Sequence, residues 1–385
     1  MKILFVQKMN GISGSELYMI QIMPELKRRG YDIEMLIIYP VYGQNNKRFI
    51  EYMAEHGIKT HEIYGHWAMS PILFSRINKI LNEGNYDLVQ TNLIHADFWL
   101  TFVKSVFFKK KLKIVSVKHG YHPSYQAKYG HDLRFLKRDI YYWVARFASR
   151  RTDFNITISK GLYSIYVDGE IVNASRIRNI YYGLTLTNPV HSEEVKVPTG
   201  DYLLITGRLV GFKGHSFLIQ AWKKVKTIYP ALKLYFAGEG ECRAELEQEV
   251  KDAGLQNEII FLGHTPNPHP LMASSVFTIV SSVWEGFGLI LLESWLHKKA
   301  IVAFDAPAMN EVIDDGRNGL LATLKDSNAL ADKIIHLYEN PQLAKEYGEN
   351  GYQKLNSYYT LQRMTDETEQ VYQAIYAGQP VPLVG

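Results

Sequence analysis

The chain has 385 residues, of which 46% are hydrophobic and 21% are charged, a composition typical of globular proteins rather than disordered or fibrous ones. This length predicts two domains, and no apolar run reaches the ~18 residues of a membrane-spanning helix or resembles a signal peptide. The one cysteine, Cys242, excludes an intrachain disulfide, so we expect a cytoplasmic protein.

Charge is distributed unevenly along the chain. Residues 1–190 contain 26 Lys and Arg against 15 Asp and Glu, whereas residues 191–385 contain 17 against 24. The basic half suggests contact with an anionic surface, for which a membrane leaflet and a pyrophosphate-bearing acceptor fit equally well, and a solvated basic face is the alternative interpretation. No helix-turn-helix, zinc-finger or RNP pattern accompanies the basic half, so nucleic acid is not expected as a partner. Segments 107–113 and 146–151 mix aromatic and basic residues. They fit an anionic membrane, and solvated helix ends explain them equally well.

Short apolar runs alternate with amphipathic segments from the start of the chain. Strands are predicted at residues 2–7, 32–39, 87–90, 113–118, 155–158 and 178–181, and helices at 15–29 and 47–56. Strands separated by helices predict a parallel sheet. Ligands of such sheets bind beyond the carboxyl ends of the strands, so the loops that follow the strands are the candidate sites.

The apolar rhythm stops between residues 184 and 200, where Thr, Asn, Pro, His and Glu predict a linker between domains. It then resumes, with strands predicted at 202–206, 233–237, 259–262, 277–280 and 300–304 and a helix at 216–227. The sequence therefore predicts two successive doubly wound α/β halves.

The most informative motif runs from Glu285 to Glu293, follows the predicted strand 277–280 and opens a helix. On one continuous helix the two carboxylates would diverge by roughly 80°, so we expect Glu285 in a loop and Glu293 in the helix. Glycines let the backbone approach a ligand, and free amides at a helix start suit a phosphate. Carboxylates accept hydrogen bonds from sugar and ribose hydroxyls.

A second motif, residues 207–214, follows the predicted strand 202–206 and carries Arg208 and Lys213 among three glycines. Two cations on one loop can clamp a diphosphate and offset the charge of a leaving group. A solvated turn or chance explains either motif alone. Their joint occurrence, each after a predicted strand, is much more specific.

Together the motifs resemble those of the retaining GT-B glycosyltransferases of group 1, the GT4-like type. Segments 237–240, 262–264 and 310–321 also match the family pattern. The resemblance covers nearly the whole chain. It implies two Rossmann-like domains facing each other across a cleft. Residues 1–185 would form the acceptor side, with a C-terminal helix within 361–385 packing back on it, and residues 186–360 would bind the nucleotide sugar.

The resemblance also implies roles for single residues. Arg208 and Lys213 would bind the donor diphosphate, Glu285 would hold hydroxyls of the transferred sugar, and Glu293 would bind the ribose. The residues implied in catalysis are Glu285, His119, Arg208 and Lys213. Further donor contacts are implied for Gly14, Gly238, Gly263, His264, Gly286, Phe287, Gly288 and Leu289.

In the N-terminal half, segment 11–16 resembles the family's "GGxE" loop, with Ser13 in place of the first glycine. An ordinary helix start is the alternative interpretation. The loop is neither a Rossmann nor a Walker sequence, so NAD and ATP are not expected. His119 follows strand 113–118 where the family often has a His that contacts the donor sugar. Segment 95–97 is an open candidate for the acceptor side, and segment 182–185 lacks the Asn and Asp of the family's "NGvD".

The implied reaction is sugar transfer with retention of configuration from a nucleotide diphosphate sugar, with UDP-sugar favoured and GDP-sugar next. The acceptor would be a glycan or a lipid-linked sugar in surface polysaccharide or lipopolysaccharide assembly. The resemblance also implies no metal and no other cofactor, and the sequence agrees in that the cleft loops carry neither an Asp-x-Asp pair nor a His/Cys cluster. Peripheral contact with the inner face of a membrane stays open. The alternatives are a nucleotide-sugar epimerase on the same fold and a non-catalytic protein that binds sugar nucleotides.

Overall fold

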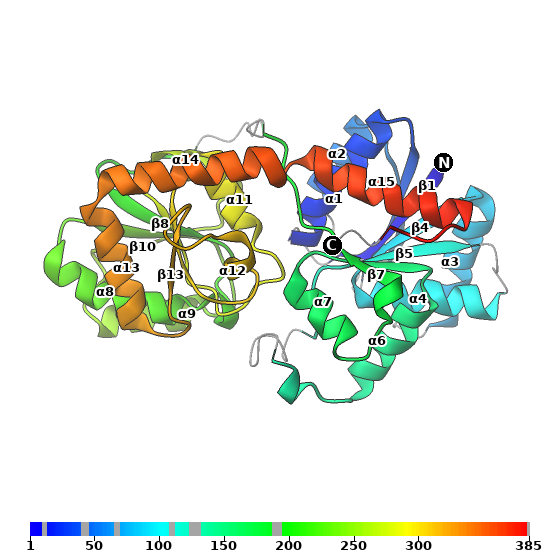
Figure 1. Ribbon diagram of the computed structural model, residues 1–385, viewed down its shortest axis with the longest axis horizontal. Helices are drawn as coiled ribbons and strands as arrows, with labels where there is room; N and C mark the ends of the chain where they lie inside the picture. Colours follow the sequence, from blue (N-terminus) through cyan, green and yellow to red (C-terminus); the bar gives the residue numbers. More distant parts are fainter. Residues whose placement is uncertain are drawn as a thin grey trace. The chain divides into compact units, whose positions relative to one another are not determined.

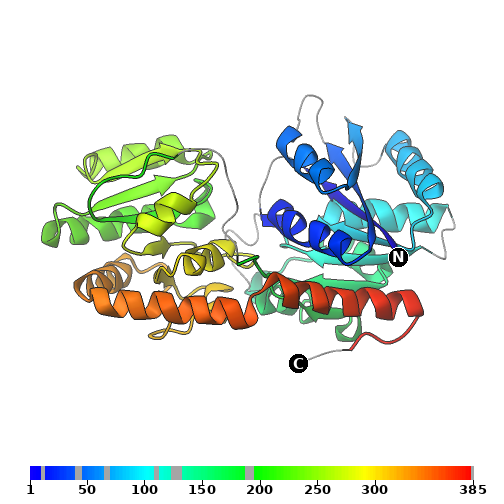
Figure 2. The ribbon, with the colours of Figure 1, turned by 90° about the horizontal axis from the view of Figure 1, so that it is seen from above.

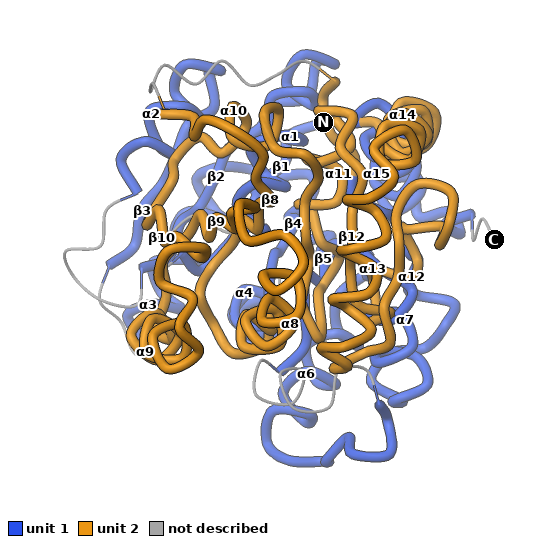
Figure 3. Tube along the Cα trace, turned by 90° about the vertical axis from the view of Figure 1, so that its left-hand side faces the viewer, with its two compact units in different colours: residues 1–125, 131–182, 361–385 blue, residues 126–130, 183–360 orange. Residues whose placement is uncertain are grey.

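The computed structural model describes residues 1–9, 14–39, 46–64, 70–107, 112–122, 132–186 and 195–382. The described chain divides into two compact units (Figure 3). Unit 1 contains the described residues from 1 to 182 together with residues 361–382, and unit 2 contains the described residues from 183 to 360. Each unit is built around one parallel sheet (Figure 1).

The sheet of unit 1 has seven strands in the order β3-β2-β1-β4-β5-β6-β7. Its strands are β1 Lys2–Lys8, β2 Asp32–Tyr39, β3 Lys59–Tyr64, β4 Leu88–Asn92, β5 Lys113–Lys118, β6 Phe154–Thr157 and β7 Ile177–Asn179. The strand order reverses direction between β1 and β4, which pair in parallel with Ile3 opposite Leu88. In sheets of this kind the crevice that takes a ligand opens at such a reversal.

Helices cover both faces of this sheet. They are α1 Gly14–Arg28, α2 Lys47–Glu55, α3 Pro71–Gly84, α4 Leu93–Val106, α6 Ile140–Arg151, α7 Lys160–Val167 and α15 Leu361–Ala377. Local chemistry sets their ends: α3 begins with Pro71 and stops at Asn85, which has a left-handed φ of 49°. None of the described helices is long and apolar enough to cross a membrane.

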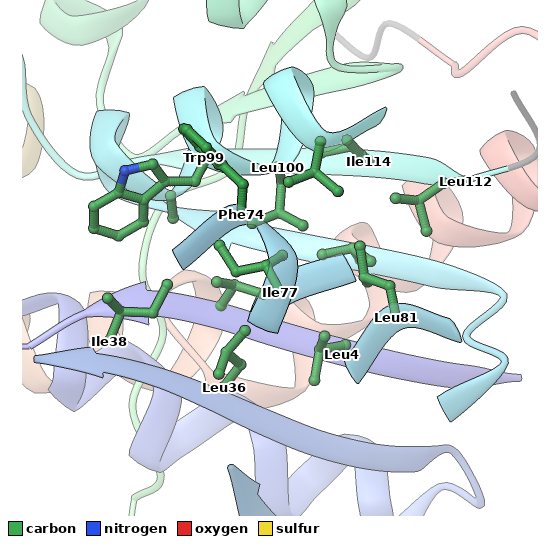
Figure 4. Packing of buried hydrophobic residues seen from close by; sticks show 14 of the residues in the cluster. Leu4, Leu36, Ile38, Phe74, Ile77, Leu81, Trp99, Leu100, Leu112 and Ile114 are labelled. Carbon is green, nitrogen blue, oxygen red and sulfur yellow. The ribbon is translucent and has the colours of Figure 1, made fainter. Parts of the chain in front are cut away.

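The core of unit 1 lies between the sheet and the pair α3 and α4 (Figure 4). Leu4 and Leu36 of neighbouring strands pack against Phe74 and Ile77 of α3, and Leu100 of α4 closes the cluster. The central strands β1 and β4 are buried along nearly their whole length because helices cover the sheet on both faces. This cluster packs α3 and α4 against one face of the sheet.

The last helix, α15, belongs to unit 1 and lies beside α1 (Figure 2). Tyr372 is fully buried, and its hydroxyl donates a hydrogen bond to Oε1 of Gln90 in β4. Arg29, at the end of α1, forms ion pairs with Asp366, at 2.6 Å, and with Glu369. Helix α15 therefore supplies both apolar and polar partners to the N-terminal part of the chain.

Unit 2 repeats the plan with six strands in the order β10-β9-β8-β11-β12-β13, which reverses between β8 and β11. Its strands are β8 Tyr202–Thr206, β9 Lys233–Ala237, β10 Ile259–Gly263, β11 Thr278–Val280, β12 Ile301–Phe304 and β13 Leu320–Ala322. Its helices are α8 His215–Ile228, α9 Arg243–Asp252, α10 His269–Ser274, α11 Leu289–Leu296, α12 Met309–Val312, α13 Ser327–Glu339 and α14 Pro341–Tyr358.

The two doubly wound sheets predicted from the sequence are confirmed, and every predicted strand and helix lies within two residues of an observed one. Sequence analysis did not predict strands β3 and β13, nor did it predict helices α3, α4, α6, α7, α9, α10, α12, α13 and α14. Strand β3 is an edge strand with only one fully buried residue, Ile63, so it lacks the apolar run that marks the central strands. Strand β13 has three residues, too few to show a period.

Segment 95–97 was an open candidate for the acceptor side, and the structure rules out its Asp97 as a surface residue, while His95 is exposed. The Asp97 side chain is fully buried on α4 and forms an ion pair with the equally buried Lys118 of β5, with 2.5 Å between Oδ2 and Nζ. The hydroxyl of Thr91 donates to the other carboxylate oxygen at 2.5 Å. Burial lowers the pKa of Lys118, and Asp97 opposes that shift. The pair therefore fastens α4 to the carboxyl end of β5.

We expect Asp97→Ala to lower the free energy of unfolding by about 3–5 kcal/mol, because it leaves the Lys118 ammonium buried without a carboxylate. Urea unfolding measures the loss. The double variant Asp97→Ala/Lys118→Met should recover most of it, since neither charge then remains buried. Equal destabilisation of the single and double variants would show that the charge is not the cause.

Candidate functional site

Three loops of unit 2 come together at the reversal of its strand order. Residues 207–214 follow β8, residues 238–242 follow β9, and residues 281–288 follow β11. Because β9 and β11 flank β8 in a parallel sheet, all three loops leave the same edge. The candidate residues Arg208, Lys213 and Glu285 are on these loops.

The loops after β8 and β9 are joined through their backbones. The Gly207 amide donates to the Ala237 carbonyl at 3.0 Å, and the Leu209 amide donates to the Glu239 carbonyl at 2.9 Å. A Cβ atom on Gly238 would lie 1.8 Å from the Gly207 carbonyl oxygen. Close packing of backbone on backbone thus gives the predicted donor contact Gly238 a structural reason to be glycine, whether or not it also touches a ligand.

The loops after β8 and β11 are joined just as closely. The Val283 amide donates to the Phe212 carbonyl and the Ser281 hydroxyl donates to the Lys213 carbonyl, each at 2.9 Å. Gly214 has a left-handed φ of 67°, and a Cβ atom there would lie 2.1 Å from the Ser281 carbonyl oxygen. These contacts fix the backbone on either side of Lys213.

Lys213 and Glu285 form the central charged pair. Nζ of Lys213 lies 2.5 Å from Oε1 of Glu285, and the Ser282 hydroxyl donates to the same oxygen at 2.7 Å. Glu285 is buried, whereas the Lys213 side chain is partly exposed. Arg208, on the same loop as Lys213, is exposed and has no side-chain partner within the described part of the chain. Lys213 is therefore oriented by Glu285 before any ligand binds, and Arg208 is a second, exposed cation on the same loop.

Helix α11 adds backbone donors to this site. Its N-cap, Gly288, has a φ of 85°, and the buried Phe287 anchors the turn that precedes it. The first amides of a helix have no intrahelical acceptor and carry partial positive charge, so the amides from Leu289 onward can receive an anion. As predicted, Glu285 lies in the loop and Glu293 lies within the helix.

Glu293 is partly buried, and burial raises the pKa of its carboxyl from the ordinary 4.5 to about 7, against the opposing charge of Lys213. Within the described residues it has no hydrogen-bond or ion-pair partner. Such a carboxyl can accept or donate a hydrogen bond near neutral pH. Two cations, helix amides and two carboxyls together suit a ligand with phosphates at one end and hydroxyl groups nearby.

Gly263 and His264 lie at the same edge of the sheet, at the end of β10. Gly263 has a φ of 77° where the register of β10 against β9 shifts, and His264 is exposed. Strand β9 separates them from β8, so they lie farther along the edge than Arg208 and Lys213. The predicted contact with a base remains a prediction.

In unit 1, His119 follows β5 and is held on both sides. Nε2 lies 3.0 Å from Oδ1 of Asn92, and Nδ1 forms a short hydrogen bond with the Tyr182 hydroxyl. An amide oxygen accepts, so Nε2 carries the proton and Nδ1 accepts from the hydroxyl. Burial lowers the pKa of His119 to about 3, so the ring is neutral at physiological pH. To make its predicted contact with the donor sugar, His119 would have to give up its hydrogen bond to Asn92 or to Tyr182.

Gly14 is the first residue of α1, and residues 11–13 of the predicted loop motif lie outside the described residues. A Cβ atom on Gly14 would meet nothing within 4 Å, so packing does not explain the glycine. The next two residues are fixed, because Nε2 of Gln7 donates to Ser15 Oγ at 3.0 Å and to the buried carboxylate of Glu16. The helix start is thereby tied to the end of β1.

The described part of the chain has no cluster of side chains that could bind a metal ion. No group of three or more His, Cys, Asp or Glu side chains is placed there to hold an ion. The expected absence of a metal remains a prediction.

Two families of known proteins match the sequence of this chain. Residues 189–354 match the family described as glycosyl transferases group 1, and residues 12–187 match glycosyltransferase family 4. The chain is a group 1 glycosyltransferase. The two matched regions together span almost all of the chain, and the group 1 match contains the three loops of unit 2.

This glycosyltransferase resembles several known proteins. It is 25% identical to the putative glycosyltransferase EpsD of Bacillus subtilis over 78% of its own length and 80% of that protein. It is 29% identical to an N-acetylgalactosaminyltransferase of Campylobacter jejuni, whose name gives a diphospho-undecaprenol acceptor, over 51% of its length and 54% of the relative. The crystal structure of Anabaena Alr3699/HepE with UDP-glucose superposes with a TM-score of 0.79 at 21% identity, covering 97% and 99% of the two chains. That likeness identifies the GT-B fold.

Sequence analysis of the glycosyltransferase missed Ser282, Asn92 and Tyr182. Asn92 ends a polar triplet on an otherwise apolar strand, and polar residues at the carboxyl end of a buried strand are a usable signal. Ser282 follows β11 in the same way. Tyr182 lies where the segment departs from the family pattern, so no motif pointed to its contact with His119.

We expect Gly238→Ala to destabilise unit 2 of the glycosyltransferase by about 1–3 kcal/mol, because its Cβ would overlap the Gly207 carbonyl. Gly211→Ala is the matched control, since a Cβ there meets nothing within 4 Å, and it should change stability by less than about 1 kcal/mol. Scanning calorimetry measures both. Equal melting of the two variants would refute the packing explanation.

Glu293 gives the glycosyltransferase a stability that depends on pH. Between pH 4.5 and about 7 the folded carboxyl keeps a proton that the unfolded chain loses, so stability falls as pH rises through this window. Glu293→Gln lacks this titration. Its Tm relative to the wild type should therefore increase from about pH 5 to about pH 8, and a pH-independent difference would contradict the raised pKa.

Proposed function

We propose that this glycosyltransferase moves a sugar from a nucleoside diphosphate sugar to a glycan or lipid-linked acceptor, with retention of anomeric configuration. The observation that carries the proposal is the Lys213–Glu285 pair beside the amides of α11. It puts a phosphate-binding cation and a hydroxyl-binding carboxylate within one hydrogen bond of each other.

The proposed roles follow from this geometry. Lys213 and Arg208 bind the diphosphate, Glu285 binds hydroxyls of the transferred sugar, and Glu293 binds the ribose. The bond between the sugar's anomeric carbon and the diphosphate oxygen breaks, and a bond to the acceptor oxygen forms on the same face. The acceptor proton passes to the departing phosphate, whose charge Lys213 and Arg208 stabilise. No metal takes part in this scheme.

UDP is the proposed nucleotide, with GDP next. The complex of HepE with UDP-glucose supports this choice because that protein has the same fold. The end of β10, with Gly263 and the exposed His264, is the proposed position of the base. Backbone amides of Gly286–Leu289 and of Gly14 complete the proposed donor contacts.

The proposed acceptor is part of a surface polysaccharide, either a growing glycan or a sugar carried on lipid diphosphate. The name of the Campylobacter relative supports the second form. The excess of Lys and Arg over Asp and Glu in residues 1–190 also favours an acceptor with an anionic group. Membrane contact follows from a lipid-borne acceptor.

A thermal-shift panel with UDP, GDP, ADP, CMP and their common sugar conjugates tests the proposal. A ligand that binds only the folded protein raises Tm by mass action, by an amount equivalent to about 2.7 kcal/mol at 100-fold excess over Kd. We expect UDP to raise Tm and Lys213→Ala to abolish the shift. With the identified donor, Lys213→Ala and Glu285→Ala should each lower turnover at least about 10²-fold.

Lys223→Ala is the matched control, because Lys223 is an exposed lysine of α8, outside the three loops. It should keep the wild-type shift and turnover. An unchanged shift in Lys213→Ala would refute the site. Nuclear magnetic resonance of the new glycosidic bond tests retention, and an inverted product would refute that part of the mechanism.

A further inference from the structure

One face of α6 exposes apolar side chains to solvent. Ile140 is 83% exposed and Trp143 is 53% exposed, and Phe135, in the short 3-10 helix just before α6, is 46% exposed. Ile140 is the most exposed large apolar residue in the described part of the chain. Positions 140 and 143 are one turn apart and so share a face. The opposite face buries Tyr142 and Ala145 against unit 1.

The same segment carries a surplus of positive charge. Six of the residues from 132 to 151 are Lys or Arg and two are Asp. Arg134 and Arg138 form ion pairs with Asp132 and Glu170. The others form no ion pair with any described residue: Lys137, Arg146, Arg150 and Arg151.

These cations lie among the apolar side chains rather than apart from them. The Arg146 guanidinium lies 5.8 Å from the ring centre of Trp143, and that of Arg151 lies 3.8 Å from the ring centre of Phe147. Aromatic rings with guanidinium groups over them are suited to the boundary between lipid headgroups and acyl chains. We call Phe135, Lys137, Ile140, Trp143 and Arg146 the α6 face.

We infer that the α6 face binds the surface of a bilayer that contains anionic lipid. Ile140 and Trp143 enter the headgroup region, while Lys137 and Arg146 bind lipid phosphates. Charge decides between this partner and a second copy of the chain. A symmetric dimer through this face would bring like charges together, which opposes association. An anionic bilayer neutralises the same charges and also receives the apolar side chains.

This inference concerns unit 1 alone and goes beyond the proposed reaction. It stands or falls independently of the donor site, because the α6 face is in unit 1 and the residues that bind the donor diphosphate in the proposal are in unit 2. The thermal shift with UDP tests the proposed donor site, and vesicle binding tests the α6 face.

The test is cosedimentation of the full chain with phosphatidylcholine vesicles, with and without phosphatidylglycerol. We expect binding to the anionic vesicles at low salt and release at high salt. Ile140→Glu should weaken binding at least about tenfold, because it removes an inserted apolar group. Lys137→Glu should weaken it at least about fivefold, because it reverses a charge at the surface.

Helix α3 supplies matched controls within the same unit. Ile72→Glu replaces an isoleucine that is 57% exposed, and Lys79→Glu replaces a lysine whose side chain is 73% exposed. Both control variants should bind vesicles as the wild type does. All four variants should keep the wild-type Tm and its shift with UDP, since each replaced side chain is exposed.

Any of the following results would overturn the inference. The first is no binding of the wild type to anionic vesicles at low salt. The second is equal binding to neutral and anionic vesicles, or equal losses in the α3 and α6 variants. The third is a wild-type dimer that Ile140→Glu converts to a monomer without any vesicle, which would make a second copy the partner of the α6 face.

Discussion

The geometry of the candidate site in unit 2 depends on how closely three loops pass one another at the edge of a parallel sheet. At Gly238 and at Gly214 a neighbouring carbonyl occupies the position where a Cβ atom would be. The loops can meet only because these residues have no side chain. Backbone hydrogen bonds then lock the loop after β8 to its neighbours on both sides. Arg208 and Lys213 thus project from a segment that can shift little.

The rigidity of this loop keeps Lys213 next to Glu285 before any ligand binds. A lysine on a mobile loop would lose side-chain freedom when it bound a phosphate, whereas Lys213 is already oriented by Glu285. An anion that reaches this lysine must share the ammonium with the carboxylate. Glu285 keeps the Ser282 hydroxyl as a second donor during that exchange. In the proposed donor complex, the phosphate and the hydroxyl groups of one ligand would therefore be recognised by groups that already interact.

The sequence predicted the sheets and the helix that carries Glu293 because buried strands and amphipathic helices leave periodic patterns. It also predicted the two charged motifs, since each follows a strand. The partners of His119 could not be predicted. Asn92 and Tyr182 are 90 residues apart in sequence, and only the order of the strands brings them to the same ring. Nor did the sequence reveal that Asp97 is buried, because a carboxylate just after a strand end fits a ligand and an internal ion pair equally well.

The chain leaves unit 1 at residue 182, forms unit 2, and returns at residue 361. During synthesis, unit 2 is therefore complete before unit 1, although unit 1 begins first. Until α15 emerges from the ribosome, Gln90 lacks the Tyr372 hydroxyl and Arg29 lacks two carboxylates. At 5–20 residues per second this interval lasts roughly 10–35 s. The surface that later receives Val371 and Tyr372 lacks this cover throughout the interval, and such transiently exposed apolar surface is prone to aggregation.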